Sequence, residues 1–466
     1  MGLHMRDGYW GVVRPAPAPS RASQRGLDWF TFFVADIHTG FGPFLAVYLT
    51  MQKWTQVDIG FVLTIGSIAG LLGQVPGGWA VDAATSKQRA AALAVAGIGV
   101  SAFLIATSPL FVTIVTAKLL HVGASSILGP AIAAITLGLV GHAAIGARLG
   151  RNARFASIGN CAAAAAMGAL GYFVSAQAVF YVTAALAIPT VIALSRIREA
   201  EVDPVRADGG LSASEQGAAS VAQLLRKPAL LVLLASVLLF HVANAAMLPL
   251  VGSAMAARSS QWATALVAAC IVVPQLIVAA ISPTVGRLAQ SWGRRPVFLF
   301  AFVALQLRGA LLALTNDPYM IVVVQMLDGV SAAVLGILVP LMLADITQGT
   351  GRFNLTQGFV GSATGIGAAL STIAAGYLAD HFGIGMAFLG LAAMAGCGLL
   401  ILLSLMPETR PQTEGLANAP RRPDLSSCAK RWDRNSDTRS RRRVVVGKPE
   451  ASSRVRGRAA AGPSSG

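Results

Sequence analysis

Charged and polar side chains occur inside stretches of this sequence that are otherwise apolar. Asp36 and His38 lie in FVADIHTGF, and Lys118 and His121 lie three residues apart in KLLHVGASSILG. A poorly solvated carboxylate binds a proton more readily than one in water, and histidine changes charge near neutral pH. Lysine supplies a positive charge for an anionic group. These residue types predict proton coupling, or binding of a polar or anionic solute.

A second set of polar residues lies in apolar stretches of the other half of the chain and includes Gln325 and Asp328, which are three residues apart. Residues at this spacing are neighbours on one face of a helix, so Gln325 and Asp328 would share a face, as Lys118 and His121 would in the first half. Charged groups within membrane spans usually face a cavity. The candidates for substrate or proton binding are Asp36, Lys118, His121, Asn244, Gln325 and Asp328.

These residues also have structural explanations. An ion pair between Asp36 and Lys118 would hold helices together, and His121 could bond to the backbone. His38 lies two positions from Asp36, on nearly the opposite helix face, so we favour a hydrogen bond to a neighbouring helix. We interpret Arg308 as paired or as reaching toward the membrane interface.

The elements that carry these residues are predicted to cross a membrane. Of 466 residues 55% are hydrophobic and 12% are charged, and the mean hydropathy is +0.65. A soluble domain has about 25% charged residues. Apolar runs of about 20 residues cross the bilayer core as helices. We predict twelve, at 29–50, 57–80, 89–107, 110–132, 155–176, 178–195, 229–251, 262–284, 296–315, 319–343, 355–378 and 384–406.

Topology explains the net charge of +16 without nucleic acid. From Arg410 onward there are fourteen basic and five acidic residues. Elsewhere basic residues concentrate in alternate loops, while the intervening loops hold only Lys53 and Arg258. The positive-inside rule then places both termini in the cytoplasm of a bacterial-type inner membrane. The four cysteines have no spacing typical of a disulfide framework or metal site.

The two halves of the chain repeat at an offset near 207. Gly286 follows Gly78 by 208 residues, and QMLDGVSAAVLG from Gln325 aligns with KLLHVGASSILG from Lys118 at 207. Transporters are often built from such repeats. We predict a cytoplasmic N-terminal segment, a helix bundle, a cytoplasmic linker, a second bundle and a disordered basic tail, at 1–28, 29–195, 196–228, 229–406 and 407–466.

One loop carries a family resemblance. GRLAQSWGRRP, at 286–296, resembles the motif between helices eight and nine of the major facilitator superfamily, with Gln290 in place of an acidic residue. The first-half copy, GWAVDAATSKQR, keeps Gly78 and Asp82. The resemblance implies an all-α membrane fold of two pseudo-symmetric six-helix bundles. It also implies that helices 1, 4, 7 and 10 line a central cavity that opens to alternate sides.

The same resemblance implies a conformational latch at the cytoplasmic helix ends. Glycines there would let helices approach, and Asp82 would stabilise a helix N-terminus. Gln290 cannot supply a carboxylate, so the second copy should be weaker. The latch residues are Gly78, Asp82, Lys87, Arg89, Gly286, Arg294 and Arg295.

These features predict a secondary active transporter that moves a small molecule by alternating access and is coupled to protons. One alternative is a multidrug/proton antiporter, although CAAAAAMGALG at 161–171 lacks the Gly-Pro-x-x-Gly-Gly pattern of many such proteins. Another is a non-transporting sensor on the same fold. We expect a monomer in the bilayer and no enzyme activity, cofactor or metal, because no catalytic or nucleotide-binding motif is present.

Overall fold

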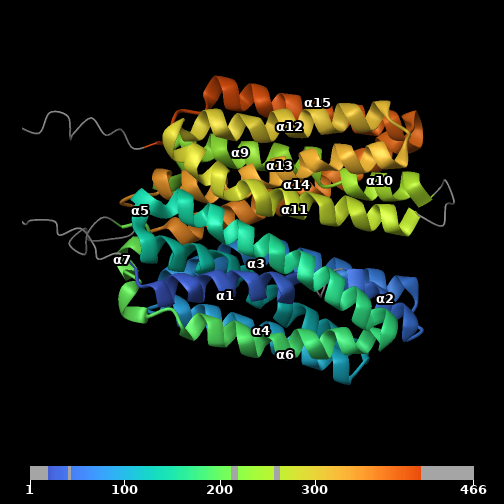
Figure 1. Cartoon of the computed structure of the whole chain (residues 1–466), viewed down its shortest axis with the longest axis horizontal. Coiled ribbons are helices and arrows are strands. Elements are labelled where there is room, and N and C mark those ends of the chain that lie inside the picture. Colours follow the sequence, from blue (N-terminus) through green and yellow to red (C-terminus); the bar gives the residue numbers. More distant parts are fainter. Residues whose placement is uncertain (1–18, 40–42, 211–218, 257–262, 411–466) are drawn as a thin grey trace, which may run out of the picture. The chain divides into compact units, whose positions relative to one another are not determined.

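The computed structural model describes residues 19–39, 43–210, 219–256 and 263–410. Within these ranges the chain is almost entirely helical (Figure 1). Ten of the described helices are long and apolar enough to cross a membrane. Most of the predicted N-terminal segment and nearly all of the predicted tail lie outside the described residues.

Three helices of the first half begin after a residue whose side chain caps them. Thr55, Ser86 and Ser175 each accept a hydrogen bond from a first-turn N–H group, which is the usual way to satisfy such donors. The helices are α1 (Arg21–Thr39), α2 (Pro43–Met51), α3 (Gln56–Ala83), α4 (Lys87–Thr107), α5 (Phe111–Phe173) and α6 (Ala176–Ser195).

Helix α5 corrects the predicted boundaries of two spans. Residues 133–154 were expected to form a loop, but they are helical. Their alanine, leucine and arginine residues favour a helix, while their four glycines disfavour it. At Gly141 the backbone has φ 68° and ψ 175°, which interrupts the helix, and glycine adopts positive φ without strain. Helix α5 therefore contains the predicted fourth and fifth spans, joined at Gly141.

The second half follows a linker whose described residues form three short helices. These are η1 (Glu199–Glu201), α7 (Pro204–Ala207) and α8 (Val221–Leu225). The longer helices are α9 (Pro228–Asn244), α10 (Met247–Ala256), α11 (Ala263–Ser291), α12 (Arg294–Leu314), α13 (Pro318–Ile346), α14 (Phe353–Phe382) and α15 (Ile384–Leu405). If α1 with α2 and α9 with α10 each count as one span, every predicted span has a helical counterpart.

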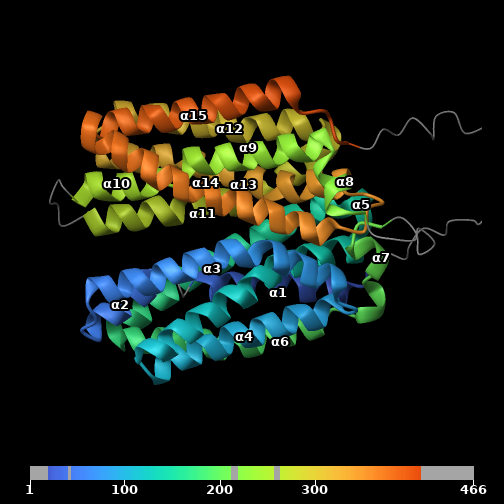
Figure 2. The same ribbon diagram turned by 180° about the vertical axis from the view of Figure 1, so that it is seen from behind.

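The helices form two bundles, α1–α6 and α9–α15 (Figures 1 and 2). In the first bundle, α4 and α6 lie on the side remote from the second bundle. In the second bundle, α12 and α15 lie on the side remote from the first. The apolar core of the second bundle extends to Leu137, Ile145 and Leu149 of α5. The linker helix α7 lies where α1 begins and α6 ends, and we call this the linker end.

A buried ion pair joins α1 to α5. Asp28 is 2% exposed and accepts hydrogen bonds from Arg148 Nη2 at 2.8 Å and Arg151 Nη2 at 2.6 Å. Arg148 also donates from Nε to Asn152 Oδ1 at 2.8 Å. The carboxylate thus has the partners that a buried charge requires.

A second polar network lies inside the second bundle, around Arg308. This side chain is 1% exposed. Its Nη1 donates to Asp328 Oδ1 at 2.5 Å and to Asn244 Oδ1 at 2.6 Å, and its Nε donates to Gln325 Oε1 at 2.7 Å. The network links α9, α12 and α13, and it shows that Arg308 is paired.

We expect Arg308→Gln to destabilise the protein strongly. The substitution leaves the Asp328 carboxylate without its cation, and breaking a buried pair in this way costs about 3–5 kcal/mol. Thermal unfolding of the purified protein in detergent should show a large fall in Tm. Arg287→Gln, at an exposed arginine of α11, is the matched control and should leave Tm nearly unchanged. Equal effects of the two substitutions would contradict this role for the network.

Candidate functional site

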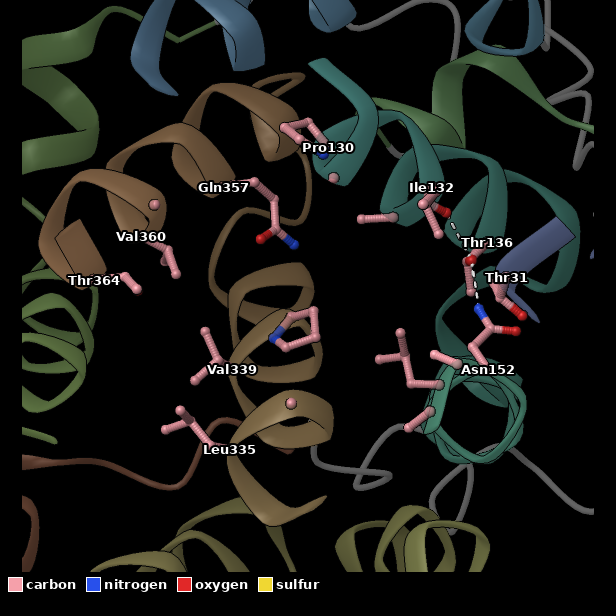
Figure 3. A pocket seen from close by; sticks show the side chains of 18 of the residues that line it. Thr31, Pro130, Ile132, Thr136, Asn152, Leu335, Val339, Gln357, Val360 and Thr364 are labelled. Carbon is pink, nitrogen blue, oxygen red and sulfur yellow. Dashed lines mark hydrogen bonds between the residues drawn. The ribbon is translucent and has the colours of Figure 1, made fainter. Parts of the chain in front are cut away.

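A cavity of about 630 Å³ lies between the two bundles (Figure 3). Its lining comes from α1, α3 and α5 of the first bundle and from α9, α13 and α14 of the second. This volume is in the range of sites for small molecules. Movement of either bundle would change the shape of the cavity, because both bundles contribute walls.

The lining is largely apolar, with a few uncharged polar groups. Carboxamides both donate and accept hydrogen bonds, so they can bind a solute without carrying charge. Among the described lining residues none is an aspartate, glutamate, lysine or arginine. The polar lining residues are Thr31, Gln74, Thr136, Asn152, Asn160, His241, Gln357 and Thr364.

The amides of the lining differ in how far they are already bonded. Asn152 donates from Nδ2 to Thr136 Oγ1 at 2.9 Å and accepts from Arg148, so it is held in place (Figure 3). Gln357 projects into the cavity. Its Nε2 is buried and has no hydrogen-bond partner in the described part of the chain. A buried donor in that position calls for a ligand or water.

The sequence-predicted candidates occupy other positions. Asn244, Gln325 and Asp328 meet at Arg308, as described above. Lys118 packs against α3, where a Cβ added at Gly66 would lie 2.4 Å from Lys118 Cε. His121 is buried, with its Nε2 3.5 Å from Ser125 Oγ. Asp36 belongs to α1, but its side chain lies outside the described residues. None of the five described candidates lines this cavity, and their roles stay predictions.

The sequence repeat relates the candidate residues of the second half to those of the first half. Asn244, Gln325 and Asp328 correspond to Asp36, Lys118 and His121 at offsets of 207 or 208. At the same offset Arg308 corresponds to Ser101 of α4, which is also buried. A serine hydroxyl carries no charge, so the first half has no cation at the position equivalent to Arg308.

Sequence reasoning did not select the amides of the cavity. Gln74 and Asn160 lie in the middle of apolar stretches, as the selected residues do, so a signal for them was present. The sequence did not single out Asn152 and Gln357 as polar residues inside apolar spans. Asn152 lies in a predicted loop, and Gln357 lies near the start of a predicted span.

At the linker end the two bundles meet through contact between α3 and α14. A Cβ added at Gly78 would lie 2.2 Å from the carbonyl oxygen of Asn354. Asp82 Oδ1 accepts the N–H of Asn354 at 3.1 Å, and Oδ2 accepts the N–H of Leu355 at 2.9 Å. First-turn N–H groups have no partner within their own helix. Asp82 therefore caps α14 from the opposite bundle.

Helices α5 and α11 make the repeat-related contact. A Cβ added at Gly286 would lie 2.3 Å from the carbonyl oxygen of Gly146. Gln290, which follows Asp82 by 208 residues, donates from Nε2 to the carbonyl oxygen of Ala143 at 3.1 Å. The α5–α11 contact therefore has one hydrogen bond between neutral groups. The α3–α14 contact has two hydrogen bonds to a carboxylate. We refer to the two contacts together as the linker-end gate.

The loop cations fold back onto the preceding helix ends in both halves. Lys87 donates to the carbonyl oxygen of Val81 at 2.8 Å, and Arg294 donates to that of Ala289 at 3.0 Å. Arg294 Nε is also 2.9 Å from Asp345 Oδ2. These contacts lie within one bundle each, so they shape the helix ends and do not join the bundles.

The other two cations predicted for the latch, Arg89 and Arg295, do not bond to the end of the preceding helix. Arg295 donates to the carbonyl oxygen of Leu403 in the same bundle. The Arg89 side chain makes no hydrogen bond or ion pair in the described residues.

The linker joins both bundles at the gate. Asp208 pairs with Lys87 at 2.7 Å and accepts from Asn354 Nδ2 at 3.2 Å. The carbonyl oxygen of Asp208 also accepts the N–H of Phe353 at 3.1 Å. Burial raises the pKa of the Asp208 carboxyl, and the Lys87 ammonium partly opposes that rise. The linker is therefore part of the contact between the two bundles at the linker end.

Two repeat-related bundles of apolar helices around a shared cavity define a multi-pass membrane transporter. The profile of the Major Facilitator Superfamily matches residues 29–260 and 233–448, and the chain belongs to this family.

The chain is similar to proteins of known sequence and structure. An uncharacterised MFS-type transporter of Mycobacterium tuberculosis is 42% identical over 405 residues, which cover 85% of this chain and 95% of that protein. The crystal structure of a human organic anion transporter has a TM-score of 0.63 at 14% identity, covering 84% of this chain and all of that one. The fucose:proton symporter of E. coli has a TM-score of 0.66 at 12% identity, covering 84% and 98%.

We expect Gly78→Ala to prevent the linker-end gate from closing. The new methyl group would overlap a backbone oxygen, which cannot move as a flexible side chain can. In a cysteine-free background, a reporter cysteine at Ala153 of the cavity should react several-fold faster with an impermeant maleimide added from the linker end. Gly60→Ala, on the same helix, is the control, because a Cβ there meets nothing within 4 Å. An unchanged labelling rate in Gly78→Ala would argue against the gate.

Proposed function

We propose that this protein is a secondary transporter that carries an uncharged, hydrogen-bonding small molecule through the cavity by alternating access. The position of the cavity carries this proposal. Both bundles line it, and the linker-end gate closes one end through a small number of contacts that can separate. A rocking movement of the bundles would open that end and expose the same lining.

The chemistry of the lining supports an uncharged substrate. The fold does not decide substrate charge, since one structural neighbour is named an organic anion transporter and another a fucose:proton symporter. Binding an anion in an apolar cavity requires a cation or several donors to replace its hydration. The described lining has carboxamides, hydroxyl groups and His241, and these match a neutral solute that donates and accepts hydrogen bonds.

We also propose that transport is coupled to protons, with Asp36 as the coupling carboxylate. This part rests on the sequence: Asp36 lies in an apolar span, and the aligned residue of the second half is Asn244, which cannot titrate. The two halves therefore differ in charge at equivalent positions, as expected if one bundle carries the proton.

Gln357→Ala should weaken substrate binding without changing the fold. Its buried Nε2 is the donor that we assign to the substrate, and one such hydrogen bond is worth about 1 kcal/mol, or roughly a fivefold rise in KM. The purified protein in proteoliposomes would be screened with pooled sugars, nucleosides and other neutral metabolites. Gln306→Ala, on α12 and away from the cavity, is the control. A substrate for which both variants have the wild-type KM would contradict the role of Gln357.

Asp36→Asn should abolish substrate-driven proton movement while substrate binding remains. A pH-sensitive dye inside the proteoliposomes reports the proton, and labelled substrate reports binding and flux. Proton movement that persists in Asp36→Asn would reject Asp36 as the coupling group. Wild-type flux without proton movement would indicate a facilitator, and binding without flux would indicate the sensor.

A further inference from the structure

A second groove lies on the outer surface of the first bundle, between α1 and α6 at the linker end. Its volume is about 600 Å³. Its lining residues belong to α1, to α6 and to the residue after α6, and it shares none of them with the central cavity. The residues that line it are Ala22, Arg25, Gly26, Trp29, Phe33, Pro189, Ile192, Ala193 and Arg196.

Gly26 brings the two walls of the groove together. A Cβ added at Gly26 would lie 3.0 Å from both the carbonyl oxygen of Ala193 and the Cβ of Arg196. The two helices therefore cross in close contact at this point. As a result Arg25, the neighbour of Gly26, and Arg196 come from different helices to the same end of one groove.

The two arginines have no counter-charge within the described chain. Both are exposed, and neither guanidinium makes a hydrogen bond or ion pair with a described residue. Two of the nearby acids are engaged: Asp28 pairs with Arg148 and Arg151, and Glu201 accepts the N–H of Ser20. Glu199 is exposed and makes no ion pair with Arg196. Two cations that line one groove repel each other, so an external anion between them would be stabilised on both sides.

Away from the arginines the groove is apolar. On α1, Trp29 and Phe33 follow Arg25 at one-turn intervals, and on α6, Ile192 and Pro189 precede Arg196 in the same direction. Trp29 is half exposed, and its ring stacks on Phe33 at a centroid distance of 6.0 Å. A tryptophan below exposed arginines is typical of the membrane–water interface.

We infer that this groove binds one anionic phospholipid, with its phosphate between Arg25 and Arg196 and an acyl chain along Trp29 and Ile192. The arginine end of the groove matches the negative phosphate of such a lipid, and the apolar end matches its acyl chain. The positive-inside rule places the linker end on the cytoplasmic side, where the leaflet carries anionic lipid and attracts basic residues. A solvent-borne phosphate would satisfy the arginines but would leave the apolar part of the groove unfilled.

The experiment measures lipid retention by native mass spectrometry. The full chain, delipidated in detergent, is titrated with phosphatidylglycerol or with phosphatidylcholine of the same acyl chains. We expect one phosphatidylglycerol to remain bound at activation energies that remove phosphatidylcholine. Arg25→Gln with Arg196→Gln should weaken this binding on the order of tenfold, because each arginine near a lipid headgroup contributes to affinity. Arg226→Gln with Arg287→Gln removes the same charge from exposed linker-end sites outside the groove and should have no effect.

Three results would overturn the inference. Equal retention of the two lipids, or equal weakening by the two double variants, would mean that the lipid is not held at this groove. Competition by soluble glycerophosphoglycerol at the same concentration as the lipid would mean that only the headgroup phosphate is recognised. Tm in phosphatidylcholine checks that the double variant is folded. If it is not, the single variants Arg25→Gln and Arg196→Gln replace it, and retention unchanged in both would equally reject the site.

Discussion

Contact between helix backbones at glycine is the constraint on which the rest of this structure depends. Gly78 lies against the carbonyl of Asn354, and Gly286 against that of Gly146, so at these two points the helix backbones meet with no side chain between them. Apolar burial contributes little between helices in lipid, where packing of small residues has to hold them. Such packing is short-ranged. A small separation removes it, so such a contact could break and re-form as the proposed alternating access requires.

The polar part of the gate follows from this contact. With the backbones so close, the unbonded N–H groups at the start of α14 come within reach of Asp82, and the linker carboxylate of Asp208 reaches Lys87 and Asn354. The second contact, between α5 and α11, has the neutral Gln290 instead. The two sides of the gate are therefore equal in steric fit and unequal in electrostatics.

Charge inside the bundles obeys a different constraint. Asp28 and Asp328, on α1 and α13, each meet arginine, because an unpaired charge away from water is too costly. The described lining of the cavity avoids charge and uses amides, of which Gln357 keeps an unbonded donor. The groove at Arg25 and Arg196 is the reverse case, since both arginines are exposed and have no described partner, and we assign an anionic lipid to them.

The sequence by itself determined the membrane class, the helices and the repeat, because these depend on local apolar length and repeated spacing. Of the seven predicted latch residues, Gly78, Asp82 and Gly286 lie where the bundles meet, and their role as a latch stays a prediction. The sequence misplaced the break in α5, which depends on the conformation of the single residue Gly141. Only the tertiary structure decided which polar residues meet. Arg308, on α12, takes Asn244, Gln325 and Asp328 as partners, and Gln357 rather than Lys118 faces the central cavity. The physical reason is that a helix exposes several faces, and only the packing of neighbours selects the face that meets the cavity.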